Sequence, residues 1–164
     1  MKVETEYVRK GALAYLAAWD VRNGRIFGLC EKKTGIVPFS RLVDQVMSVE
    51  PYVSADRVSW ILDNASYHRG QVCVDRLVAQ WPNIVPIHLP IHASWLNQVE
   101  IYFSILQRKA ITPSNSSSLL ELEETILGFQ TLYQQTAKPF EWRFTRKDLR
   151  ALMHRISARE RLVA

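Results

Sequence analysis

The chain has 164 residues, 48% of them hydrophobic and 23% charged, which is the composition of one globular domain rather than of a disordered segment. Its formal net charge of +5 is compatible with a polyanionic partner, and also with many proteins that never bind nucleic acid. No apolar run reaches the roughly 18 residues of a membrane span and the N-terminus lacks a signal-peptide pattern, so we expect a cytoplasmic protein with no membrane partner. Cys30 and Cys73 have no metal-type spacing and are expected to be reduced thiols.

The first half of the chain predicts strands and helices in alternation. Two strand-like runs, GALAYLAAWDV and RIFGLCEK, flank a tight turn at Asn23 and Gly24 and predict a β-hairpin. Apolar residues at helical spacing predict a helix from Val37 to about Val49. The elements expected next are a short apolar strand at 57–62, a helix at 71–81 and a buried strand at 83–89.

The second half predicts helices. Ser94 is a suitable N-cap for a helix whose core stripe is formed by residues at steps of three and four: Leu96, Val99, Phe103 and Leu106. Ser118 and Glu121 form a capping box for a helix from Leu119 to about Thr136. A last helix is expected over 147–159. This order of elements favours an α/β fold with a mixed sheet.

Two carboxylates stand where apolar sequence predicts burial. Asp63 follows the strand at 57–62, and Glu100 lies beside the core stripe of the helix after Ser94. Burying a carboxylate costs several kcal/mol unless a cation or a hydrogen-bond donor compensates it. Two such sites predict a shared divalent ion. Asp63 could instead be a capping residue of the turn at Asn64, and this alternative stays open.

Other candidate residues also carry two interpretations. His68 could approach a phosphate or cap the next helix. Trp95 could contact an unpaired base or pack at a helix start. Arg108 and Lys109 could face DNA, or could simply interact with the dipole of the helix that they end. The 25 C-terminal residues are the most densely basic region of the chain, and a nucleic-acid-facing role there stands beside a solvated helix face.

Two blocks carry a resemblance to a known family. The runs ILDNASYHRG at 61–70 and HLPIHASWLNQVEIYFSILQRKA at 88–110 resemble the second and third catalytic blocks of the DDE transposases, in the bacterial insertion-sequence branch of the mariner-like superfamily. The resemblance covers nearly the whole chain. It implies an RNase H-like, integrase-like fold, a mixed sheet flanked by helices, that holds three acidic residues around two Mg²⁺ or Mn²⁺ ions.

The resemblance also implies roles for single residues. Asp63 and Glu100 would be catalytic metal ligands, on opposite sides of the ion pair. The residues that would support them at the same site are Asn64, Asn97 and His68. The basic residues expected to bind nucleic acid are Arg108, Lys109, Arg146 and Lys147. The implied partner is DNA, both transposon ends and target, and the implied chemistry is metal-dependent strand cleavage and strand transfer.

The family's first catalytic aspartate lies on a strand before the hairpin, which here would fall upstream of Met1. We therefore expect residues 1–164 to be the C-terminal part of a DDE catalytic domain, with the core at 1–110 and a basic helical region at 117–164. Such a chain would be inactive alone. It would work as a homodimer or with the upstream half of a split transposase. Asp20 ends a strand at the hairpin turn and is interpreted as structural.

Two further function classes remain open. The chain could be a non-enzymatic DNA-binding or regulatory remnant of a transposase. It could also be a different RNase H-like nuclease that recruits another acid, such as Asp20 or Glu6.

Overall fold

The structure is a computed structural model that describes residues 11–90, 96–114, 116–136, 138–139, 145–148, 150–151 and 154. Its elements, in chain order, are β1 (Ala14–Asp20), β2 (Arg25–Glu31), α1 (Ile36–Met47), β3 (Val58–Leu62), α2 (Gln71–Gln80), β4 (Ile84–His88), α3 (Val99–Leu106), its π-helical continuation η2 (Gln107–Ile111), and α4 (Leu119–Thr136). Their bounds agree with the predicted ones to about three residues, except at the start of α3.

Two predicted helices differ from the structure or are described only in part. The helix expected to follow Ser94 begins only at Val99, and Ser94 itself lies outside the described residues. Of the helix expected over 147–159, the described residues 147–148, 150–151 and 154 are helical.

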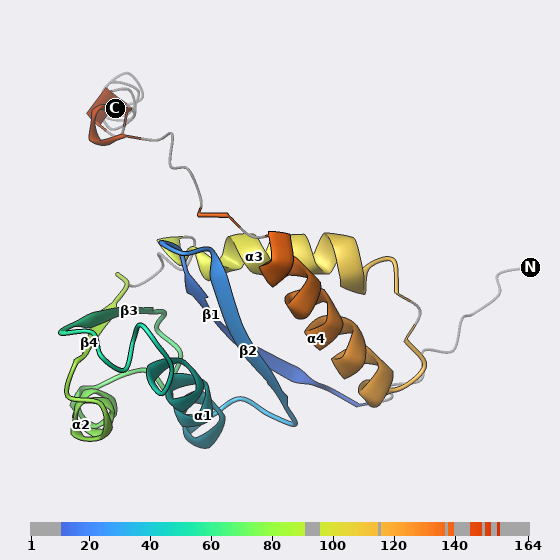
Figure 1. The fold of residues 1–164 in the computed structure, drawn as a ribbon, viewed down its shortest axis with the longest axis horizontal. Helices are drawn as coiled ribbons and strands as arrows, with labels where there is room; N and C mark the ends of the chain where they lie inside the picture. The colour runs from blue at the N-terminus through green and yellow to red at the C-terminus, as the bar shows by residue number, and fades with distance from the viewer. Residues whose placement is uncertain are drawn as a thin grey trace, which may run out of the picture.

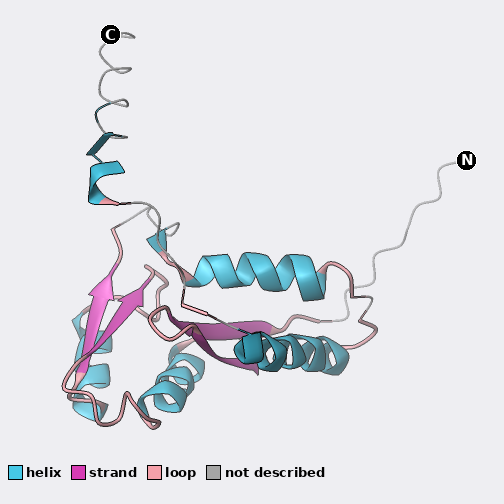
Figure 2. Ribbon diagram, turned by 45° about the horizontal axis from the view of Figure 1, so that its top comes forward, coloured by secondary structure: helices cyan, strands magenta, loops and turns pink. Residues whose placement is uncertain are grey.

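The strands form two small sheets (Figure 2). β1 and β2 pair antiparallel, from Ala14 opposite Glu31 to Asp20 opposite Arg25. β3 and β4 pair parallel, from Val58 opposite Ile84 to Leu62 opposite His88. The mixed α/β character is as predicted, but in the described part of the chain the four strands do not form the one mixed sheet that we expected. The physical reason is that no described strand lies between β1 and β3 to join them.

The hairpin β1–β2 is covered on both faces. Ala14, Leu16 and Ala18 of β1 pack into a first core, which α1 closes. The alternate residues Tyr15, Ala17 and Trp19 pack into a second core with α3 and α4, which lie on the other side of the hairpin (Figure 1). Since successive side chains of a strand point to opposite faces, a strand covered on both faces needs apolar residues throughout. This explains the unbroken apolar run AYLAAW.

The first core connects the two sheets. It contains buried residues from β1, β2, α1, β3, α2 and β4, so side-chain packing joins the sheets where the described strands do not pair. Most of the apolar face of α1 lies in this core: Phe39, Leu42, Val43, Val46 and Met47. The indole Nε1 of Trp60 in β3 donates to the sulfur of Met47, at 3.4 Å.

The helices after β4 confirm one prediction and correct another. The backbone N–H of Glu121 donates to Oγ of Ser118, at 3.2 Å, as predicted, whereas the carboxylate of Glu121 accepts the N–H of Ser117, one residue before the predicted cap. In α3 the core stripe was wrong in part. Leu96 is 41% exposed, and the buried residues of the helix are Tyr102 and Leu106. The spacing of Val99, Tyr102 and Leu106, in steps of three and four, would have predicted this stripe.

No described helix is both long and apolar enough to cross a bilayer. Cys30 and Cys73 are free, as predicted. Burial raises the pKa of the Cys30 thiol to about 11, so this thiol stays protonated at neutral pH.

Candidate active site

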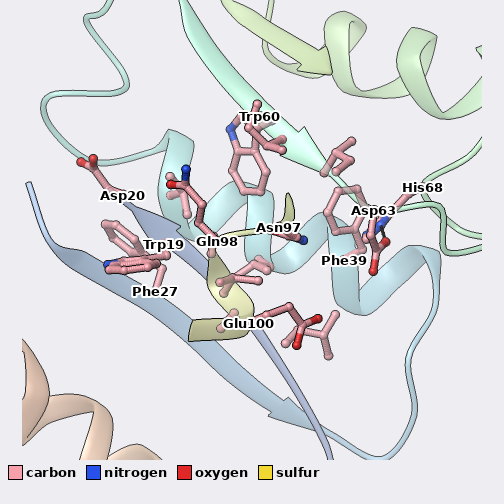
Figure 3. Close-up of a pocket in the computed structure, with 18 of the residues that line it drawn as sticks. Trp19, Asp20, Phe27, Phe39, Trp60, Asp63, His68, Asn97, Gln98 and Glu100 are labelled. Atoms are coloured by element: carbon pink, nitrogen blue, oxygen red, sulfur yellow. Dashed lines mark hydrogen bonds and ion pairs between the residues drawn. The ribbon is translucent and has the colours of Figure 1, made fainter. Parts of the chain in front are cut away.

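A cavity of about 600 Å³ lies between β1, β3 and the beginning of α3 (Figure 3). Its lining includes four of the residues that the sequence marked as a site: Asp63, His68, Asn97 and Glu100. They come from the exit of β3, from the loop after it and from the start of α3. The fold therefore brings residues of both sequence blocks to one cavity.

Asp63 directly follows β3, and its carboxylate is half-exposed. Its Oδ1 accepts the backbone N–H of Ala65, at 3.0 Å, and contacts Nδ1 of His68 at 2.6 Å. The first of these bonds closes the turn at Asn64. The capping role that was the alternative interpretation of Asp63 is therefore present. Both bonds go to Oδ1, and Oδ2 accepts none from the described residues. The capping role and a ligand role are therefore compatible, because each can use a different oxygen.

His68 contacts Asp63 and packs against two aromatic rings. Its side chain is 13% exposed, and its ring centroid lies 4.2 Å from that of Phe39 and 4.4 Å from that of Tyr67. Burial lowers the pKa of His68, and the hydrogen bond to Asp63 opposes this only in part. The imidazole is therefore neutral at pH 7. Because a carboxylate only accepts, the ring proton is assigned to Nδ1.

The residues that hold His68 were only partly visible in the sequence. Phe39 belongs to the apolar pattern of the helix predicted from Val37, but nothing in that pattern connects it to His68. Tyr67 stands inside the DNASYH block without a periodicity of its own. Sequence reasoning missed both as partners of the site.

Glu100 corrects an expectation. It is exposed, in the first turn of α3, where a negative charge interacts favourably with the helix dipole. The argument that burial of Glu100 demands a cation therefore fails. What places Glu100 at the site is its position in the lining of the cavity (Figure 3). Asn97 accepts the backbone N–H of Glu100 at its carbonyl, at 3.1 Å, and its side chain lines the same cavity.

Asn64 does not line the cavity. Its side-chain amide donates to the carbonyls of Leu89, at 2.8 Å, and Pro90, at 3.3 Å. These bonds tie the loop after β3 to the segment after β4. Asn64 therefore holds the backbone next to Asp63 in place.

Asp20 lies at the end of the cavity away from Asp63 (Figure 3). Its carboxylate accepts the backbone N–H groups of Arg22, at 2.9 Å, and Asn23, at 3.1 Å, and the hydroxyl of Tyr52 donates to it. Partial burial alone would raise the pKa of Asp20, but these hydrogen bonds outweigh it and lower the pKa. The carboxylate thus closes the hairpin turn. Glu6, the other acid considered, lies outside the described residues.

The basic residues lie elsewhere. Arg108 and Lys109 are exposed in the last turn of η2, and Arg146 and Lys147 are exposed in the helical segment near the C-terminus. None of the four lines the cavity.

Asp63 and Glu100 offer the oxygen ligands that suit a hard cation, but they are only two of the three acids that the resemblance implies. Carboxylate and amide oxygens are the ligands that Mg²⁺ and Mn²⁺ prefer. Within the described part of the chain, no group of three His, Cys, Asp or Glu side chains could hold a metal ion. Asp63 and Glu100 therefore do not form such a group with a third described side chain.

Comparison with known families matches residues 2–123 to the DDE superfamily endonuclease family. Since the match spans well over half of the chain, the protein belongs to this family. Its members typically use divalent metal ions, and their substrate is DNA. No curated protein and no solved structure matches the chain.

Proposed function

We propose that this chain is the C-terminal catalytic-core part of an insertion-sequence DDE transposase, which carries out metal-dependent DNA strand cleavage and strand transfer. One observation carries the proposal: Asp63 and Glu100, from the two blocks that resemble the family's catalytic blocks, line the same cavity. We assign them as ligands of Mg²⁺ or Mn²⁺.

A bound metal pair would activate water or a DNA 3′-hydroxyl for in-line displacement at phosphorus. The chain's own contribution is to orient the ligands. Ala65 and His68 hold Oδ1 of Asp63, which leaves Oδ2 for a metal ion. Hydrogen bonds of this kind, from outside the ligand set, commonly fix a ligand's orientation and tune its affinity. Asn64 supports the same loop, because its side-chain amide donates to backbone carbonyls of the segment after β4.

The third acid belongs to the proposal as well. We propose that the first catalytic aspartate comes from outside residues 1–164, either from the upstream half of a split transposase or from another protomer. The chain alone would then bind metal weakly and cut no DNA. The basic region 117–164, with Arg146 and Lys147, is proposed to contact DNA outside the cavity.

A second candidate is a non-enzymatic DNA-binding or regulatory remnant of a transposase. The observation in its favour is that the described residues contain no complete ligand set. A remnant would keep its DNA affinity without having any metal site between Asp63 and Glu100.

A Mn²⁺ titration followed by NMR separates the two candidates. Paramagnetic Mn²⁺ should broaden signals of residues around Asp63 and Glu100 first, and Asp63→Asn or Glu100→Gln should each weaken this effect about tenfold or more. The matched controls are Asp56→Asn and Glu124→Gln, which neutralise exposed acids outside the cavity lining. Broadening spread evenly over the surface acids, with DNA affinity unchanged in all four variants, would favour the remnant.

A further inference from the structure

The two sequence blocks of the site hold each other's backbone. The side-chain amide of Asn64, in the first block, donates to the carbonyls of Leu89 and Pro90, in the second. In the opposite direction, Nε2 of His88, the first residue of the second block, lies 2.6 Å from the carbonyl oxygen of His68. Because a carbonyl oxygen only accepts, the ring proton of His88 is assigned to Nε2. His88 therefore connects the start of the second block to the loop after β3.

His88 stands where packing alone would favour an apolar residue. It is the last residue of β4, opposite Leu62 of β3, and by the alternation of strand side chains it shares a face with Ile84. Leu62 and Ile84 are both buried in the first core. His88 is half-buried, and a polar ring in such a place needs a hydrogen-bond partner. The carbonyl of His68 is that partner, so this contact accounts for a histidine at the position.

The carbonyl of His68 depends on this donor. Among the described residues, no backbone N–H donates to it. Two other hydrogen bonds of His68, from its N–H to the carbonyl of Ala65 at 2.9 Å and from its ring to Asp63, lie within the loop 63–68 (Figure 3). They fix His68 relative to its own loop, whereas His88 fixes it relative to β4. Because the ring moves with its backbone, its position beside Asp63 depends on His88.

We propose that His88 is a positioning residue for Asp63 and that it acts through the backbone of His68. The Nε2–H of His88 holds the carbonyl of His68, and the ring of His68 holds Oδ1 of Asp63 with its Nδ1–H. Oδ2 of Asp63 then keeps a fixed direction. This role rests on the proposed function for the metal ion that Oδ2 would bind, but the orientation of the carboxylate does not need the ion and can be measured without it.

The imidazole protons provide the first test. Nitrogen-15 NMR of the full chain at pH 8, without metal, should find the proton of His88 on Nε2 and that of His68 on Nδ1. His88→Leu removes the donor and keeps an apolar side chain on the covered face. The share of His68 rings with the proton on Nε2 should then rise at least about threefold, the effect of one lost hydrogen bond. His88→Gln, whose amide nitrogen can reach the same carbonyl, should restore the wild-type share.

A Mn²⁺ titration provides the second test. Because His88 acts on Asp63 only indirectly, His88→Leu should weaken the broadening around Asp63 by about threefold to tenfold, less than a change of the ligand itself. The matched control is Asn83→Leu, because this side chain also donates to backbone carbonyls, those of Tyr52 and Ala55, but just before β4. It should lower the free energy of unfolding and leave the Mn²⁺ response around Asp63 unchanged. His88→Gln should keep the response within about twofold of the wild type.

Two results with these variants would overturn the proposal. One is an equal loss of the Mn²⁺ response in His88→Leu and Asn83→Leu, because both would then reflect stability alone. The other is a His88→Gln variant that behaves like His88→Leu. If His88→Leu does not fold, the wild-type tautomers decide, since a proton on Nδ1 of His88 or on Nε2 of His68 contradicts the chain of hydrogen bonds.

The outcomes for the metal site and for His88 are separable. A wild-type Mn²⁺ response that His88→Leu leaves unchanged would reject the positioning role and leave the metal site standing. No site-specific response in the wild type, together with a His68 tautomer that shifts in His88→Leu, would reject the metal site and support the positioning role.

Discussion

At the residue scale, Asp63 and Glu100 both line the cavity, but their carboxylates lie in different surroundings. Asp63 is half-exposed and hydrogen-bonded through one oxygen, whereas Glu100 is exposed at a helix start. Because the carboxylate of Asp63 is only partly buried and has hydrogen-bond donors, its position does not require a cation. The burial of Glu100 was inferred from an apolar stripe whose first member, Leu96, is itself largely exposed. The motif alone, and not the burial argument, therefore predicted Glu100 as a site residue.

The contribution of His68 to the stability of the fold can be tested by changing the pH. Its contact with Asp63 has the geometry of an ion pair, yet burial outweighs that contact and lowers the pKa of His68 in the folded chain. Burial should dominate because the ring is 13% exposed and packed between aromatic rings. The unfolded chain then binds the proton more readily. The contribution of His68 to stability is therefore complete above the unfolded pKa of about 6.5 and is lost as the pH falls below it.

Urea denaturation at pH 8, 7, 6 and 5 measures this dependence. The free energy of unfolding should fall between about pH 7 and pH 5, and His68→Gln should flatten that part of the curve. His154→Gln, at an exposed histidine, is the control and should leave the slope unchanged. A free energy of unfolding that rises on acidification, and does so only when His68 is present, would show that the ion pair dominates instead.

At the element scale, hydrophobic periodicity located the strands and helices, and local turn chemistry located their ends. The hairpin shows both. Its strands follow from apolar runs and its turn from Asn23 and Gly24, where Gly24 takes a φ of 70° that suits glycine. Lys138 lies within 3 Å of where a side chain on Gly24 would start, so this turn also packs against the segment after α4.

Asp20 should stabilise this hairpin rather than serve catalysis. Asp20→Ala removes the acceptor for two backbone N–H groups and for the Tyr52 hydroxyl, and should cost about 1–3 kcal/mol. Chemical denaturation measures the loss, with Asp56→Ala, at an exposed aspartate, as the near-neutral control. The site-specific Mn²⁺ response around Asp63 should persist in Asp20→Ala. Its disappearance from a folded variant would instead support a nuclease that recruits Asp20.

At the scale of the whole molecule, one core holds two sheets whose described strands do not pair with one another. α1 links the two sheets, because its buried face packs against the hairpin and its Phe39 and Met47 contact Trp60 of β3.

Met47 is fully buried in that core and bonds to Trp60 of β3. Met47→Ala should cost about 2–5 kcal/mol, because it removes buried apolar volume and leaves a cavity. Hydrogen exchange should then show lower protection in β1 and in β3 together. Val72→Ala, at a side chain that is 79% exposed, should change the stability by less than about 0.5 kcal/mol. Lower protection in only one sheet would show that the two sheets unfold independently.

Much of the fold could be predicted from the sequence, since most of its elements depend on local patterns. The periodicity of apolar residues, the turn at Gly24 and the cap at Ser118 act over a few neighbouring residues, and the structure contains the corresponding elements. The motif residues Asp63 and Glu100 were recognised in the same way. Family membership followed from these blocks and is confirmed by the family match.

Only the tertiary structure decided which of these elements contact one another. The exposure of Glu100, the aromatic packing of His68 and the split into two sheets depend on contacts between segments far apart in the chain. No local pattern shows which strand edge remains unpaired, because that depends on every other strand. The sequence by itself thus determined the elements and the motif residues. The three-dimensional packing determined which carboxylates share a cavity.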